Sequence, residues 1–188
     1  ALEQYMKNFI QIGTIVIIMI NMGLVASEKT DGSLQFLLVR PVHRLALIMA
    51  KLAAMKGAIL AGLLVAMVCM ASYTWYLFPG FPIALFLVSN VFLFLYFITI
   101  GVIIVSLSTL VNKPIYAAVL SLALWLIFSL LSVVNRIGAF SFTRVEDQMM
   151  QVIEGFPLTV KPSIGAFVLM IVLIAIAYLH LSRWEPKD

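Results

Sequence analysis

Residues 9–26, FIQIGTIVIIMINMGLVA, contain no charged side chain. As a helix this run would be about 27 Å long, close to the roughly 30 Å thickness of the hydrocarbon core of a bilayer. It is followed by residues 28–44, EKTDGSLQFLLVRPVHR, in which ionic and apolar groups are mixed, and then by a second long apolar run. The pattern predicts a short amphipathic segment between two membrane spans.

The composition of the whole chain supports this interpretation. Of its 188 residues 64% are hydrophobic and only 11% are charged, with a mean hydropathy of +1.15. A soluble domain carries about 25% charged residues, so this chain is predicted to be an all-α, polytopic membrane helix bundle that forms one transmembrane domain over residues 1–188. Cys69 is the only cysteine, which excludes an intrachain disulfide, and the net charge of +4 forms no basic stripe, so no nucleic-acid partner is indicated.

Breaks in the apolar pattern divide the chain into spans. FPGFP at 78–82 and NKP at 112–114 are turn signals, and the polar start of the chain lacks the features of a signal peptide. Five visible spans and a first residue other than Met predict one further helix upstream, in a parent protein of six spans. The five predicted spans are residues 9–26, 45–78, 83–111, 115–134 and 163–182.

Basic residues predict which side each connection faces. Cytoplasmic loops are enriched in Lys and Arg, and the segments at 27–44, 112–114 and 183–188 carry them. The FPGFP turn has no charge, and residues 135–162 have a net charge of zero, so both are predicted to lie outside. We therefore expect a protein of the plasma membrane with an external N-terminus and a cytoplasmic C-terminus. Three aromatic residues would then lie at the outer headgroup level: Tyr73, Trp75 and Tyr76.

The segment at 27–44 is predicted to form a short helix. Thr30 or Asp31 is a suitable N-cap, Pro41 would end the helix, and leucines recur at helical spacing between them. Such a helix could float on lipid headgroups, or its leucines could enter a groove on a cytoplasmic partner. The amphipathic pattern alone leaves both alternatives open.

The same segment resembles the signature of the permease subunits of type-2 ATP-binding-cassette exporters, apart from Gln35, where the family usually has an acidic residue. The resemblance implies that residues 27–44 form the coupling helix, which sits in a cleft of a separate ATP-binding subunit. ATP and Mg²⁺ would be bound by that partner, and a second permease copy, identical or different, would complete the transporter. The coupling residues implied are Glu28, Lys29, Gly32, Ser33, Leu34, Leu37, Leu38, Arg40, Pro41 and Arg44.

The segment at 135–162 is predicted to contain a second short helix, at about 144–154. Thr143 and Glu146 have the spacing of a capping box, and Gly155 would end the helix. The resembled family often has re-entrant helices here, whereas a simple interfacial anchor has the same pattern. Both interpretations remain open.

Other polar and small residues predict packing rather than chemistry. Asn90 and Asn135 lie in or beside spans, where an amide most often bonds to a neighbouring helix. No catalytic, cofactor or metal site is predicted, because His43 and His180 have no second ligand at metal spacing. Small residues predict close helix packing, within the subunit or across a dimer, at Gly57, Ala58, Ala61 and Gly62.

The predicted function is that of the membrane subunit of an ATP-driven exporter, which itself breaks no bond and binds no cofactor. The chain has no phosphate-binding loop of the form GxxxxGK[ST], so an ATPase would be a separate chain. The uncharged spans favour an apolar or amphipathic substrate: a lipid, a drug, a peptide or a lipid-linked polymer. The alternatives are a membrane scaffold or channel without ATP coupling and a membrane-embedded lipid enzyme, which would need clustered His, Asp or Glu.

Overall fold

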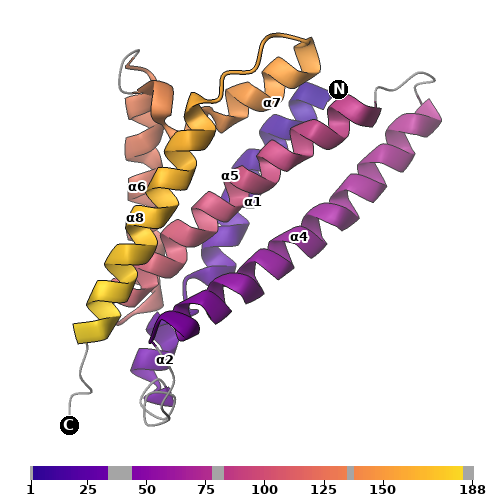
Figure 1. Ribbon diagram of the computed structural model, residues 1–188. Coiled ribbons are helices and arrows are strands. Elements are labelled where there is room, and N and C mark those ends of the chain that lie inside the picture. The colour runs from indigo at the N-terminus through magenta and orange to yellow at the C-terminus, as the bar shows by residue number, and fades with distance from the viewer. Residues whose placement is uncertain (1, 34–43, 78–82, 135–137, 184–188) are drawn as a thin grey trace.

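The computed structural model describes residues 2–33, 44–77, 83–134 and 138–183, and every regular element in these ranges is a helix (Figure 1). The elements are α1 (Leu2–Asn21), α2 (Ala26–Thr30), α4 (Arg44–Leu77), α5 (Ile83–Leu110), α6 (Pro114–Ser132), the 3₁₀ helices η1 (Gly138–Phe140) and η2 (Phe142–Arg144), α7 (Val145–Glu154) and α8 (Lys161–Arg183).

Five of these helices are long and apolar enough to cross a membrane, which confirms the predicted all-α polytopic bundle. The helices α4, α5, α6 and α8 begin and end within two residues of the predicted spans. Long, mainly apolar runs therefore located these helices accurately, because each run is bounded by a Pro, an Asn or an Arg.

The first span differs from its prediction. The helix α1 starts at Leu2 rather than at residue 9, and it ends at Asn21, so a continuous helix over 9–26 is wrong. The Asn21 side chain donates to the carbonyl oxygen of Ile17 (2.8 Å), and a turn at residues 22–25 leads into α2. The apolar segment at 6–30 remains long enough to cross the membrane despite this break.

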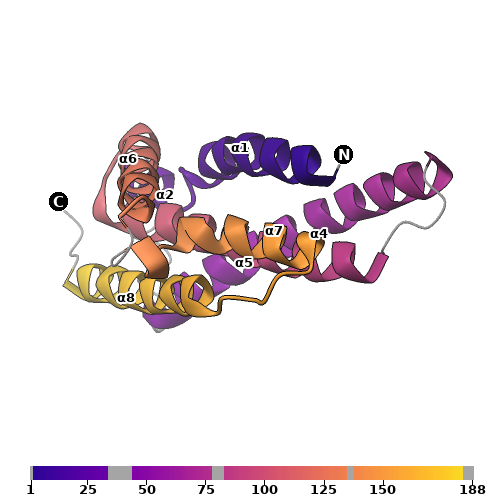
Figure 2. The same ribbon diagram turned by 90° about the horizontal axis from the view of Figure 1, so that it is seen from above.

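The helix α5 lies at the centre of the bundle and contacts every other long helix. In its most apolar window 67% of the residues are buried, against 33% or less in the other spans. Seen from above, α1 and α6 lie on one side of α5 and α8 on the other (Figure 2). No residue of α5 between 92 and 109 is exposed, so this part of the helix is covered on all sides, which explains why α5 shows no amphipathic pattern.

The helix α4 crosses α5 closely at one point. A Cβ atom at Gly101 of α5 would overlap the sulfur of Met55, so a larger residue there would require the Met55 side chain to move. From the crossing towards its last residue α4 moves away from α5, and between residues 64 and 77 only Thr74 is buried (Figure 1). The two helices therefore pack tightly in one half of the bundle and separate in the other.

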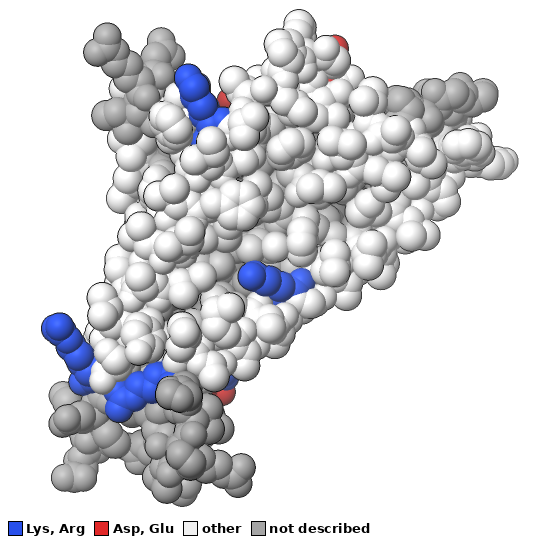
Figure 3. Space-filling model, in the orientation of Figure 1, with Lys and Arg blue, Asp and Glu red and all other residues white. Residues whose placement is uncertain are grey.

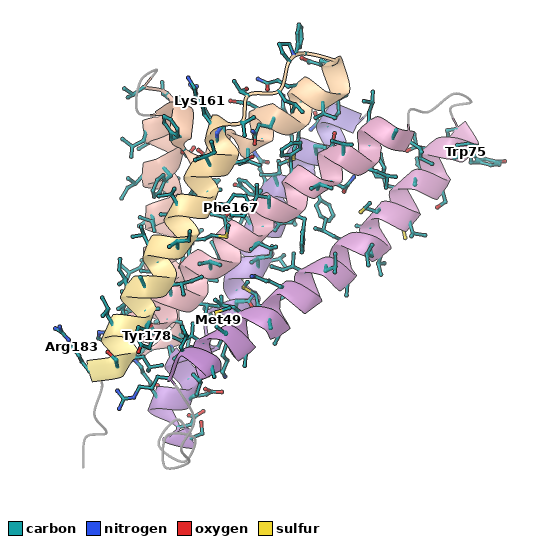
Figure 4. The ribbon with its side chains drawn as sticks, in the orientation of Figure 1. Met49, Trp75, Lys161, Phe167, Tyr178 and Arg183 are labelled. Carbon is teal, nitrogen blue, oxygen red and sulfur yellow. The ribbon has the colours of Figure 1, made fainter. Side chains whose placement is uncertain are left out.

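We call the two ends of the bundle the α2 end and the α7 end. Figure 4 shows Lys161 and Arg183 at opposite ends of α8, and Trp75 on the part of α4 farthest from Met49. Between the two ends the face in Figure 3 is almost entirely uncharged. Exposed aromatic side chains on α4 at the α7 end are Tyr73, Trp75 and Tyr76.

The helix α7 forms as predicted but begins differently. It covers residues 145–154 and ends at Gly155, which has a φ of 75°. The predicted capping box is wrong, because Arg144 precedes the helix and makes no side-chain cap, and the Thr143 hydroxyl lies 3.3 Å from the carbonyl oxygen of Phe128 on α6. A tertiary bond to α6 thus takes the hydroxyl that the local pattern assigned to the cap.

Neutral side chains hold α7 against the start of α8. Gln148 is 1% exposed, donates to the carbonyl oxygen of Thr159 and accepts from the Ser163 hydroxyl (2.7 Å). The Gln151 side chain accepts from both the backbone and the hydroxyl of Thr159 (3.1 and 2.7 Å). Two glutamines therefore satisfy the polar groups of the connection at 155–160.

Aromatic rings fill the space between α1, α5, η2 and α6 near the α7 end. Phe9 contacts Phe97 with ring centroids 5.8 Å apart, Tyr96 contacts Phe142 at 5.9 Å, and Phe142 contacts Phe128 at 5.3 Å. Ring pairs at these distances add to the energy of burial. The α7 end is therefore held by neutral hydrogen bonds and packed rings.

Candidate functional site

The segment that the sequence predicts to be functional leaves the bundle at the α2 end. Residues 34–43 lie outside the described residues, and with them Leu34, Leu37, Leu38, Arg40 and Pro41. The structure describes what holds the segment on each side, which is α2 before it and the start of α4 after it. These two flanks form the candidate site.

Ser108 of α5 fixes the break between α1 and α2. Its hydroxyl oxygen accepts from the backbone amides of Val25 (3.2 Å) and Ala26 (2.9 Å) and donates to the carbonyl oxygen of Met22 (3.0 Å). The side chain is fully buried, and one hydroxyl offers one donor and two acceptor positions. All of its hydrogen-bonding capacity is therefore used at this break.

Glu28 of α2 is paired with Lys51 of α4. The Lys51 ammonium group bonds to one oxygen of the Glu28 carboxylate and also donates to the carbonyl oxygen of Leu24 (2.8 Å). The two side chains are 20% and 25% exposed, so the pair is mostly shielded from solvent. This ion pair joins the segment before residues 34–43 to the helix after them.

Two further side chains join α2 to the connection between α5 and α6. The Lys29 ammonium group donates to the carbonyl oxygen of Thr109, and the Thr30 hydroxyl donates to the carbonyl oxygen of Asn112 (2.6 Å). Both acceptors are backbone carbonyl groups: that of Thr109 lies in the last turn of α5, where a helix has carbonyl groups without intrahelical partners, and that of Asn112 lies in the connection to α6. A displacement of α2 would therefore be transmitted directly to α5 and to the connection between α5 and α6.

Arg44, the first residue of α4, binds the end of α8. Its guanidinium group donates to the carbonyl oxygens of Leu181 (2.6 Å) and Ser182. A cation at the C-terminal carbonyls of a helix is favoured by the helix dipole. The start of α4 is thereby tied to the last span.

Three of the predicted coupling residues make bonds within the bundle. Glu28, Lys29 and Arg44 bind α4, α5 and α8. Gly32 has a φ of 73°, a conformation that L side chains rarely adopt, and Ser33 is exposed. The flanks therefore consist of inward-facing links and an exposed turn at 31–33.

Sequence reasoning missed the partners of these links. Lys51 falls within the predicted span 45–78, and Ser108 and Thr109 fall within the predicted span 83–111. Three polar residues within four positions, SLST at 106–109, are unusual in an apolar run and were the available signal. Neither the pairing with Glu28 nor the bond to Met22 can be read from spacing, because the partners are 23 and 86 residues apart.

The small residues predicted to pack closely lie on an open part of α4. Ala58, Ala61 and Gly62 are exposed, and a Cβ atom at Gly57 or Gly62 would meet nothing within 4 Å among the described residues. The close helix contact that they predict is therefore not made within this part of the chain.

Charges differ between the two ends. At the α7 end both signs occur together, on Lys7, Arg144, Lys161, Glu146, Asp147 and Glu154. There, burial raises the pKa of the Glu146 carboxyl, the Asp147 carboxylate raises it further and Lys7 partly opposes them. At the α2 end the acidic residues Glu28 and Asp31 are outnumbered by Lys29, Arg44, Lys51, Lys113 and Arg183.

Comparison with known proteins identifies the family. No curated protein and no solved structure matches the chain. A family model described as ABC-2 family transporter protein matches residues 2–154, which include α1, the candidate site and α7. Five apolar helices and this match together indicate a multi-pass membrane component of a transporter. The chain belongs to the ABC-2 transporter family.

Proposed function

We propose that this chain is the membrane subunit of an ATP-driven exporter and that residues 27–44 couple it to a separate ATP-binding subunit. Membership of the family implies a cytoplasmic ATP-binding partner in general. That partner would bind ATP and Mg²⁺ and carry out hydrolysis, and this chain would convert the resulting movement into a change of helix packing.

The charge distribution supports a cytoplasmic position for the α2 end. Among the described residues, five basic residues against two acidic ones at that end, and a mixture of both signs at the α7 end, are what the preference of Lys and Arg for the cytoplasm produces. The N-terminus and α7 would then be external, and the C-terminus cytoplasmic.

The observation that carries the proposal is the set of links on both sides of residues 34–43. Before the segment, Glu28 and Lys29 bind α4 and the end of α5; after it, Arg44 binds the end of α8. A force on the segment would therefore reach three spans at once. A segment that only rested on headgroups would not need links to three separate helices.

A second copy of the chain, identical or different, completes the proposed transporter. The faces of α1 and α6 carry large exposed apolar side chains over several turns, among them Ile12, Met19, Val119 and Leu130. Because lipid and a second protein can both cover such a face, the proposal of a dimer is argued mainly from membership of the family. A path bordered by these side chains suits an apolar or amphipathic substrate.

The test is association with an ATP-binding protein. The tagged chain would be purified from solubilised membranes of its source cells, and co-purifying protein would be labelled with 8-azido-ATP and assayed for Mg²⁺-dependent ATPase activity. Leu37→Asp should lower the intensity of the labelled band at least tenfold, because a charge cannot enter an apolar groove. Membrane insertion of the variant should be unchanged.

The matched control is Leu158→Asp, an exposed leucine in the connection between α7 and α8 at the opposite end. It introduces the same charge and should leave the ATP-labelled band unchanged. Full association in Leu37→Asp, or equal loss in both variants, would show that residues 27–44 do not dock an ATP-binding subunit and would favour a channel or scaffold.

A further inference from the structure

A cleft opens between α4 and α5 on the side of their crossing that faces the α7 end. Its volume is about 200 Å³, and its walls are apolar side chains of α4, such as Leu60, Leu64 and Met67, and of α5, such as Leu87 and Phe94. The cleft follows from the geometry described above, because α4 touches α5 at Gly101 and then moves away from it (Figure 4).

One polar side chain lines this apolar cleft. Asn90 is 3% exposed, and its amide nitrogen donates to the carbonyl oxygen of Phe86 in the same helix (2.8 Å). Its amide oxygen is buried and has no hydrogen-bond partner among the described residues. An acceptor without a donor in an apolar environment is costly, so a partner that brings a donor would be favoured.

The position of Asn90 restricts what that partner can be. Asn90 is seven residues into α5, about 10 Å from its start, and the exposed Trp75 and Tyr76 of α4 mark the membrane surface at the same end of the bundle. The acceptor therefore lies below the headgroups, in one leaflet. Water is scarce at that depth, and the donor must arrive on a molecule that is otherwise apolar.

The cleft is too small to enclose a whole helix. A helix with its side chains is 10–12 Å wide, far more than 200 Å³ can hold over several turns. Sites for whole drug-sized ligands are also larger, about 300–1,000 Å³. The volume suits part of a single hydrocarbon chain with a small polar group.

We propose that the cleft between α4 and α5 is a lipid site that takes one hydrocarbon chain bearing a hydroxyl or amide N–H group. The chain enters from the leaflet at the α7 end, its methylene groups contact Leu64 and Val91, and its donor bonds to the amide oxygen of Asn90. The site does not depend on an ATP-binding subunit, so its test is separate from that of the proposed function.

The experiment uses the purified chain in lipid nanodiscs and two photoactivatable probes, hexadecanol and hexadecyl methyl ether, each with a diazirine near the end of the chain. The probes differ only in the donor. Labelling of peptides from α4 and α5 should be 3- to 10-fold stronger with the alcohol, as expected for one hydrogen bond in an apolar site. Asn90→Leu should reduce alcohol labelling to the level of the ether.

Asn21→Leu is the matched control. Asn21 is also buried and also donates to the carbonyl oxygen four residues earlier (2.8 Å), but it lies at the end of α1 and does not line the cleft. Alcohol labelling should be unchanged in this variant. Equal labelling by the two probes, or alcohol labelling that survives Asn90→Leu, would overturn the proposal.

Two further variants cover the remaining outcomes. Leu64→Trp, at an exposed position beside the cleft, should fill it and abolish labelling by both probes, and persistent labelling contradicts the site. In a Cys69→Ser background, oxidation of Leu64→Cys would cross-link two copies if a second chain covered the cleft. Such a cross-link would show that a second protein chain, rather than a lipid, covers the cleft, and it would overturn the proposal.

Discussion

The α2 end and the α7 end of this molecule differ in whether charged side chains link their helices. At the α2 end Lys29, Lys51 and Arg44, whose charges sit on long, flexible stems, link helices alongside the neutral hydroxyls of Thr30 and Ser108. At the α7 end the side chains that join α7 to the start of α8 are those of Gln148 and Ser163, which are neutral. A long cationic side chain can follow a moving acceptor, whereas a short buried amide holds one arrangement.

The difference matches the roles proposed for the two ends. A coupling site must transmit displacement, and bonds to backbone carbonyls at helix ends can be broken and remade as the helices shift. The α7 end adds aromatic packing between α1, α5, η2 and α6, which resists such shifts. We therefore expect the α7 end to act as the fixed base against which the α2 end moves.

The largest expected effect is that of Ser108→Ala. Three backbone groups, on Met22, Val25 and Ala26, would lose their partner, and at roughly 1 kcal/mol each the free energy of unfolding in detergent should fall by about 3 kcal/mol. Ser121→Ala is the control, because Ser121 is equally buried but bonds only to Ala117 in its own helix (2.8 Å). An equal loss of unfolding free energy in both variants, measured by chemical denaturation, would show that the bonds of Ser108 to the α1–α2 break contribute no more than a bond within one helix.

The course of the spans was largely predictable from the sequence, because an apolar run of about 20 residues has few alternatives to a membrane helix. The end of α1 was not, since the run stays apolar through residue 26 while Ser108, far away in the sequence, stabilises the break. The capping box failed for the same reason: the Thr143 hydroxyl is used by Phe128. Local patterns are overruled where a distant group satisfies the backbone.

The candidate site was predictable only as a segment. The motif at 28–44 predicted a coupling segment, but it did not predict that Glu28 and Arg44 bind other helices of the bundle. Pairings such as Glu28 with Lys51 depend on how helices cross, and span order alone does not determine this. The apolar positions at 34–38, outside the described residues, remain the predicted docking face.

Lys51→Met should have the next largest effect and tests whether the charged links transmit movement. It leaves the half-buried Glu28 carboxylate without its cation and removes the bond to Leu24, a loss of about 2 kcal/mol of stability. If the link transmits movement, substrate-stimulated ATPase activity of the assembled transporter should fall about tenfold while the ATP-binding subunit still co-purifies.

The charge-reversed pair Glu28→Lys with Lys51→Glu serves as the control for Lys51→Met. It keeps an ion pair at the same place and should restore part of the stimulated activity. If Lys51→Met lowers stability but leaves stimulation intact, the charged links are structural only, and the contrast between the two ends loses its functional meaning.

Gln148→Leu should have a smaller effect of another kind. The carbonyl oxygen of Thr159 and the hydroxyl of Ser163 lose a partner, and the free energy of unfolding should fall by about 1–2 kcal/mol. Because the α7 end is the fixed base, stimulated ATPase activity measured well below the unfolding temperature should be unchanged. Lost stimulation in this variant would show that the α7 end moves as well.

The smallest expected effect concerns the pH dependence of the α7 end. The raised pKa of Glu146 means that the folded protein holds this proton more tightly than the unfolded chain does. Its contribution to stability is therefore greatest at low pH and falls as pH rises from the ordinary value of 4.5 through the raised one. Glu146→Gln removes the carboxylate, so the variant should unfold at a higher temperature than the parent near neutral pH, and its stability should not fall with rising pH in this way.

Glu154→Gln is the control, because Glu154 lies at an exposed position at the end of α7, and this variant should keep the pH dependence of the parent. A parent protein whose unfolding temperature does not fall over this pH range would show that the Glu146 carboxylate is accommodated without cost, because Lys7 then compensates for both its burial and the charge of Asp147.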